Sequence, residues 1–108
     1  MTDETHIEFN EKELRQKINL ETGQLEWAEL ARHFAKGMVV VIDPSLDLID
    51  VAVKFCADDK AQFEQWTNDG LVRRALDDDA RRWNEEASVF WSTVVAPWLL
   101  VQEIAKEG

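Results

Sequence analysis

Cysteine, proline, glycine and histidine are all scarce in this chain. Its 108 residues include one cysteine, two prolines, four glycines and two histidines, and there is no tyrosine. The single cysteine, Cys56, excludes an internal disulfide framework, and together with two distant histidines it makes no zinc pattern. Neither the glycine spacing nor any short motif matches a phosphate-binding loop, a nucleophile elbow or a metalloprotease helix. We therefore expect no cofactor and no metal site.

Long hydrophobic runs and an excess of basic residues are also missing. The longest apolar stretch, residues 89–101, is interrupted by Ser92, Thr93 and Pro97 and is too short to span a bilayer as a helix. The first residues have neither the basic region nor the apolar core of a signal peptide. A net charge of −10 disfavours binding to nucleic acid or to an anionic membrane. These features predict a cytoplasmic protein without a nucleic-acid or membrane partner.

What is present is the composition of a globular protein. Hydrophobic residues make up 45% of the chain and charged residues 31%, and a chain of this length can bury one core without disulfides. Residues 1–9 are predicted to be a flexible acidic tail and residues 103–108 a polar tail. Residues 10–102 between them are predicted to form a single α+β domain.

The hydrophobic pattern predicts an intermixed order of helices and strands. Helices are expected from 10 to about 22, 27 to about 36, 45 to about 57, 60 to 66 and 77 to about 86. Strands are expected at 38–42, 71–75 and 89–95, with 98–102 as a continuation or partner of the last strand. Residues 24–27 are ambiguous between strand and helix entry. Because Pro97 cannot donate a ladder hydrogen bond, the last strand should lie at an edge or bulge there.

This order predicts an α+β fold in which a small three- to four-stranded sheet carries helices packed mainly on one face.

Charged residues cluster between positions 73 and 82. The acidic triplet 77–79 has the chemistry of a Mg²⁺ or Ca²⁺ site, but acids at a helix N-terminus also satisfy free N–H groups. The arginine pairs 73–74 and 81–82 flank the triplet and have the chemistry of an anion site. The structural interpretation, in which acids and arginines compensate one another, is favoured. The best small-molecule hypothesis is an anion site built from Arg74, Arg81 and Trp83.

Other possible catalytic groups have simple structural explanations. Asp47, Asp50 and Asp58 lie on one polar stripe of an otherwise apolar helix, which is typical of a solvated face. Cys56 falls inside the apolar pattern, and no sequence feature brings it to His33, its only plausible base. Neither group is assigned a catalytic role.

Tryptophan is abundant, with five copies. Three of these fall on the apolar stripes of predicted helices and are expected in the core. Trp91 and Trp98 lie in the last strand region, where both faces are apolar. Because helices on one side can cover only one face, a second subunit is a natural cover for the other. Trp91 and Trp98 are therefore the predicted interface of a homodimer or of a complex with a protein partner.

Several segments resemble an uncharacterised bacterial family, domain of unknown function 2288. The resemblance covers residues 14 to 102, and its most distinctive part is 94–102 (VVAPWLLVQ). The weaker segments are 19–22 (NLET), 27–30 (WAEL), 46–49 (LDLI), 58–60 (DDK) and 72–75 (VRRA). The resemblance implies a stand-alone bacterial cytosolic protein. It supplies no activity or cofactor, so no residue role is carried over.

Two functional classes remain open at this point. The leading hypothesis is a non-enzymatic interaction or regulatory domain that is homodimeric through its last strand. The alternative is an anion binder or enzyme that uses Arg74, Arg81 and Trp83. Mimicry of nucleic acid by an acidic surface ranks below both, because no segment has a dense acidic run.

Overall fold

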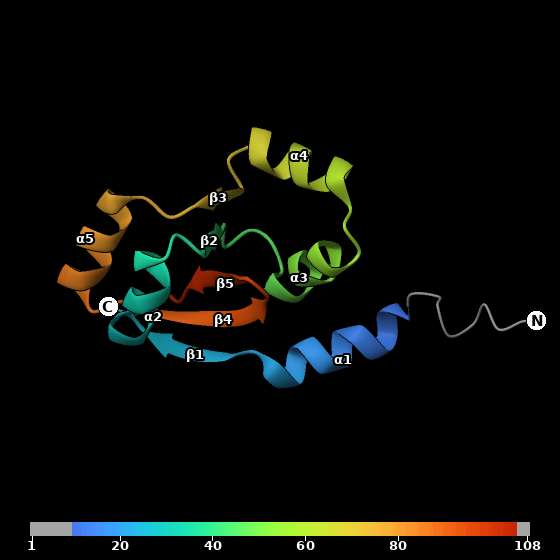
Figure 1. Cartoon of the computed structure of the whole chain (residues 1–108), viewed down its shortest axis with the longest axis horizontal. Helices are drawn as coiled ribbons and strands as arrows, with labels where there is room; N and C mark the ends of the chain where they lie inside the picture. Colours follow the sequence, from blue (N-terminus) through green and yellow to red (C-terminus); the bar gives the residue numbers. More distant parts are fainter. Residues whose placement is uncertain (1–9, 106–108) are drawn as a thin grey trace, which may run out of the picture.

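The chain folds around one mixed sheet of five strands (Figure 1), as a computed structural model that describes residues 10–105. The strands are β1 (Gly23–Glu26), β2 (Val39–Ile42), β3 (Val72–Arg74), β4 (Val89–Val95) and β5 (Trp98–Glu103). The helices are α1 (Glu11–Glu21), α2 (Trp27–Ala35), α3 (Leu48–Cys56), α4 (Lys60–Asn68) and α5 (Asp77–Glu86). The strand order is β1-β4-β5-β2-β3. Only β2 and β5 run parallel, while the other neighbours are antiparallel.

The centre of the sheet is the hairpin of β4 and β5. Val95 pairs with Trp98, so Ala96 and Pro97 form the two-residue connection, which contains a cis peptide bond. Residues 98–102 are therefore the partner of β4 and not its continuation. The prediction that the last strand lies at an edge or bulges at Pro97 is wrong. Because the proline occupies the turn, it removes no ladder hydrogen bond, and β4 lies between β1 and β5.

Both faces of the sheet are covered by helices of the same chain. Val40 and Leu100 point to the face covered by α1, α3 and α4, which we call the α4 face. Leu99 and Val101 point to the face covered by α2 and α5, the α5 face. In Figure 1, α2 and α5 lie at the left of the sheet, and α1, α3 and α4 lie at its right and top. Successive side chains of a strand point to opposite faces of the sheet, so the same strands contribute residues to both cores. A strand that is covered on both faces is therefore apolar on both faces.

The α+β class is confirmed, but two details of the predicted sheet are wrong. The sheet has five strands instead of three or four, because residues 23–26 pair with β4 before α2 begins. A four-residue strand carries too little periodicity to be separated from a helix entry. Helices also pack on both faces instead of mainly one. The apolar pattern of 89–101 therefore has a cover within one chain.

Capping residues set the helix boundaries. Asn10 Oδ1 accepts from Glu13 N at 3.1 Å, as the capping pattern predicts. α3 begins at Leu48 rather than at 45, because the Asp47 carboxylate accepts from the backbone N–H of Ile49 at 2.8 Å.

The chain ends differ from the predicted domain limits at one position. β5 extends through Glu103, which was predicted to begin the polar tail. The predicted acidic tail, residues 1–9, lies outside the described residues. Within residues 10–105, no helix has the length and apolar character needed to cross a membrane.

Candidate functional site

Helix α4 covers its end of the sheet incompletely. None of its residues is fully buried, and Phe63 and Trp66 are its half-buried members. Two adjoining cavities lie between α4, the end of α3 and the sheet, with volumes of about 670 and 330 Å³. We call them together the aromatic groove. Both cavities are lined by Phe55, Phe63, Thr67 and Trp98.

Aromatic rings form the wall of this groove. The Phe55 and Phe63 ring centroids are 4.0 Å apart at an interplanar angle of 61°, and Phe63 meets Trp66 edge-on at 5.7 Å. Edge-to-face contacts of this kind are favourable arrangements of aromatic rings. Phe55 and Phe63 therefore give the groove an aromatic wall, with Trp66 packed against Phe63. The volume of the groove lies in the range of small-molecule sites.

Arg74 is the fixed cation of the aromatic groove. Its guanidinium carbon is 5.1 Å from the centroid of the Trp98 ring, and its Nη2 donates to the Gly37 carbonyl oxygen at 2.8 Å. Gly37 has φ +73°, and a Cβ there would approach Arg74 Nη2 to 3.3 Å. Glycine thus suits both the backbone turn and the close approach. Within residues 10–105, no carboxylate pairs with Arg74.

The three residues of the predicted anion site are not brought together. β3 places Arg73 and Arg74 on opposite faces, and Arg74 joins Trp98 on the α4 face. Trp83 is 1% exposed in the core of the α5 face. Arg81 forms an ion pair with Asp78 at 2.9 Å, and both side chains are largely exposed. A single ligand cannot touch all three side chains, so that combination is wrong. Only Arg74 remains at a cavity of ligand size.

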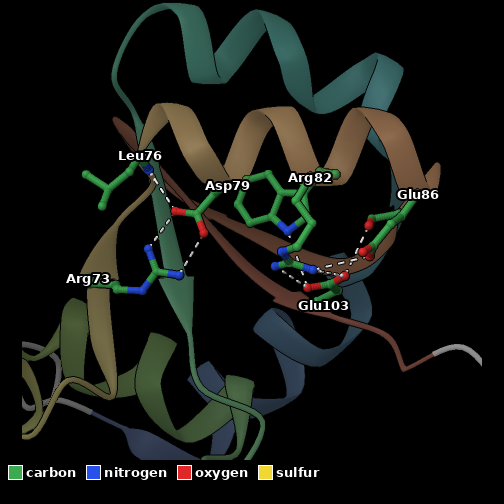
Figure 2. A network of polar contacts seen from close by, with 8 residues as sticks. Arg73, Leu76, Asp79, Arg82, Glu86 and Glu103 are labelled. Carbon is green, nitrogen blue, oxygen red and sulfur yellow. Dashed lines mark hydrogen bonds and ion pairs between the residues drawn. The ribbon is translucent and has the colours of Figure 1, made fainter.

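A network of arginines and carboxylates closes the α5 face (Figure 2). Arg73 donates from both terminal nitrogens to the Asp79 carboxylate, at 2.6 and 2.9 Å. The backbone N–H of Leu76 donates to the same carboxylate at 2.8 Å. The hydrogen bonds from Arg73 lower the pKa of Asp79, against the opposing effect of burial. This pair fastens the start of α5 to β3.

Glu103 plays the same part at the other end of α5. Arg82 donates to both of its carboxylate oxygens, at 3.0 and 3.2 Å. The indole of Trp83 and the hydroxyl of Ser88 add hydrogen bonds at 3.3 and 3.0 Å. Burial raises the pKa of Glu103, but the combined hydrogen bonds outweigh burial and lower it. The sequence missed Glu103 because it was assigned to a tail, although it continues the alternation of Leu99 and Val101.

The cavity beside this network is a poor anion site. It has a volume of about 210 Å³ and is lined by Arg73, Arg82 and Glu103, among others. Each of its arginines already faces a carboxylate. The charges there stabilise the contact between α5 and the sheet.

The acidic triplet and the Cys56–His33 pair, the other groups considered for chemistry, are not assembled into a site. Asp79 turns inward to Arg73, while Asp78 pairs outward with Arg81. In the part of the chain that the structure describes, no group of three acids, histidines or cysteines is arranged to hold a metal. Cys56 is exposed at the end of α3 rather than buried. His33 lies on α2, a helix of the opposite face.

Trp91 and Trp98 occupy opposite ends of the hairpin. Trp98 is half-buried in the aromatic groove, whereas Trp91 is 43% exposed beside the end of α1. Trp91 lines a fourth cavity of about 470 Å³ together with Asn19 and Gln102. The Gln102 amide donates to the carbonyl oxygens of Asp43 and Leu46, so its N–H groups are used to hold that loop.

Fold and site define an α+β protein whose mixed sheet carries helices on both faces, with the aromatic groove on the α4 face. The chain belongs to the family described as "Protein of unknown function (DUF2288)", whose model matches residues 13–103. The resemblance seen in the sequence is thereby confirmed. The chain is also similar to the NMR solution structure of PA1075 from Pseudomonas aeruginosa, with a TM-score of 0.77 and 31% identity over 100% of this chain and 97% of that one. None of the curated proteins matches.

Proposed function

We propose that this protein is a non-enzymatic binding domain whose binding surface is the aromatic groove. One observation carries the proposal: an aromatic wall and the guanidinium of Arg74 line the same cavity. Pockets that are mostly apolar, with a few placed polar groups, are typical of ligand sites. The acids with lowered pKa, Asp79 and Glu103, are held by arginines on the opposite face. They serve the fold, so the proposal assigns no reaction.

A neutral apolar dye tests the groove without invoking charge. Nile red should bind to the wild type and gain fluorescence. Phe63→Glu should abolish that gain, because it places a carboxylate in the aromatic wall of the groove. The variant should still fold, because α4 has no fully buried residue. Trp91→Ser, which removes another exposed aromatic ring, is the matched control and should keep the signal. Dye binding that survives Phe63→Glu, in a variant with an unchanged folded spectrum, would contradict the proposal.

A second candidate function is self-association through the outer edge of β1. β1 is an edge strand with β4 as its neighbour in the sheet, so its outer backbone groups face no strand within residues 10–105. Trp91 is 43% exposed on β4 beside it, and Leu20, just before β1, is 85% exposed. An edge strand with apolar neighbours suits pairing with the same strand of a second copy. The interior position of β4 and β5 excludes pairing through the hairpin itself.

The oligomeric state tests this second candidate. A homodimer measured by light scattering at micromolar concentration should dissociate when Leu20 and Trp91 are both replaced by serine. Leu76→Ser is the control, because Leu76 is 61% exposed at the start of α5, away from β1. A monomeric wild type would end the homodimer proposal and leave the groove proposal intact.

A bacterial, cytoplasmic setting belongs to the same proposal. The bacterial source of the similar structure supports the origin. The single cysteine, exposed on α3, fits a reducing compartment.

A further inference from the structure

We infer that the ligand of the aromatic groove is a small apolar monocarboxylate, such as a medium-chain acyl or aryl carboxylic acid, with its carboxylate at Arg74. The inference rests on the proposed function, because it names the occupant of the same groove. It adds the charge, the orientation and the size class of that occupant.

The distribution of charge along the groove sets the orientation. The smaller cavity is lined by two arginines, Arg73 and Arg74, and by no carboxylate. Arg73 is already paired with Asp79 on the other face, which leaves Arg74 as the cation for a ligand. The larger cavity has Lys60 at its rim, but Asp58 and Glu64 accompany it there. An anionic group is therefore favoured at the Arg74 end and disfavoured at the Lys60 end.

The geometry of Arg74 suits a carboxylate. A guanidinium has five N–H donors in a planar fork, and the contact with Gly37 uses one of its terminal nitrogens. The Trp98 ring and the Gly37 carbonyl both contact the guanidinium, so part of the side-chain ordering that an anion would require is already present. A carboxylate that accepts from the remaining donors forms charge-assisted hydrogen bonds.

The rest of the groove suits an apolar chain or ring. Beyond Arg74, the wall continues through Phe63 and Phe55 to Val95 and Ala96 of the hairpin. These four side chains are apolar, and the polar lining of the larger cavity comes from α4 and the residue Asp58 before it. A free inorganic anion would leave this surface wet, and a cationic ligand would meet Arg74. An amphiphilic acid satisfies both ends at once.

A pair of matched ligands tests the inference by calorimetry. Octanoate and octanamide have the same chain and nearly the same head-group shape, and they differ in charge. The wild type should bind octanoate about ten- to a hundredfold more tightly than octanamide, as expected for hydrogen bonds to a charged group. Arg74→Gln should remove this preference and leave octanamide binding unchanged.

Two controls keep the result interpretable. Arg81→Gln removes the same charge from an exposed pair on α5 and should preserve the octanoate preference. Arg74→Lys keeps the charge but lacks the planar fork, and it should retain only part of the preference for octanoate over octanamide.

The possible failures are distinguishable. Equal affinity of the wild type for octanoate and octanamide would overturn the carboxylate assignment, while the groove would stand as an apolar site. A preference for octanoate that survives Arg74→Gln would also overturn it, because the anion would then bind elsewhere. Absence of binding by both ligands would overturn the inference, and if Nile red also failed to bind, it would overturn the proposed function.

Discussion

The helices α5 and α4 meet the two faces of the sheet in different ways. On the α5 face, Trp83 and Phe90 are buried, and Asp79 and Glu103 fasten both ends of the helix through arginines. On the α4 face, α4 has no fully buried residue, and Arg74 meets an aromatic ring instead of an acid. The arginines beside α5 are paired with carboxylates of the chain, whereas Arg74 beside α4 has no paired carboxylate within residues 10–105 and lies at an aromatic wall.

This difference separates stability from binding. Substitutions on the α5 face should act on the free energy of unfolding. Substitutions in the aromatic groove should act on ligand affinity with little effect on the fold. Charged clusters are often suspected of being functional, yet here the densest cluster is structural.

Truncation of one tryptophan on each face is the strongest way to break this comparison. Trp83→Ala should lower the free energy of unfolding by about 3–5 kcal/mol, because it empties a core site that is 1% exposed. Trp66→Ala on α4 should cost about 1 kcal/mol, since that ring is only half-buried. Denaturant unfolding measures both, and equal costs would contradict the comparison.

Two neighbouring aspartates test the ion pairs at a smaller scale. Asp79→Asn should destabilise the fold by about 1–2 kcal/mol, because it removes a carboxylate that accepts from Arg73 and from the Leu76 backbone. Asp78→Asn should change the stability by less than about 0.5 kcal/mol, because both Asp78 and Arg81 are exposed. Thermal unfolding measures both effects. If Asp78→Asn lowered the Tm as much as Asp79→Asn does, the contacts of Asp79 would not be a special source of stability.

Acid titration should report the same network. The pKa values of Asp79 and Glu103 are lowered in the folded protein. Their stabilisation is therefore complete above the unfolded values, about pH 4, and is lost as the pH falls through the lower folded values. Unfolding free energy measured at decreasing pH should fall in that window. Asp79→Asn should flatten the fall, and a profile identical to that of the wild type would argue against the assignment.

An effect of the opposite sign is expected at Thr93 on β4. Thr93 is 2% exposed, and its hydroxyl finds no hydrogen-bond partner within the described chain. Thr93→Val should stabilise the protein by about 1 kcal/mol, because it removes an unsatisfied buried group and keeps the shape. Thr93→Ser is the control that keeps the hydroxyl and loses the methyl group. A destabilised valine variant would mean that the hydroxyl has a partner, such as a bound water.

Much of the fold follows from local signals in the sequence. Asn10, Asp59 and the triplet 77–79 mark helix starts that the structure has, and the β-branched run at 38–42 is β2. The short strand expected at 71–75 is β3, whereas the edge strand β1 has only four residues, too few for a clear pattern. The parallel pairing of β2 with β5 is a long-range contact that local patterns do not encode.

The candidate site was harder to predict than the fold. The sequence groups Arg74 with Arg81 and Trp83, which are its neighbours along the chain. The structure gives it Gly37 and Trp98 instead, from distant parts of the chain. Because neighbouring residues of a strand point to opposite faces, the sequence does indicate that Arg73 and Arg74 lie on different faces of the sheet.

The five tryptophan indole N–H groups provide the most direct test of the central claim, that binding belongs to the aromatic groove. Trp98 lines the aromatic groove, whereas Trp27 and Trp83 belong to the α5 face. In proton–nitrogen correlation spectra, titration with octanoate should shift the Trp98 indole signal and leave those of Trp27 and Trp83 in place. Shifts of Trp27 and Trp83 as large as that of Trp98, or an unmoved Trp98 signal at saturating octanoate, would contradict it.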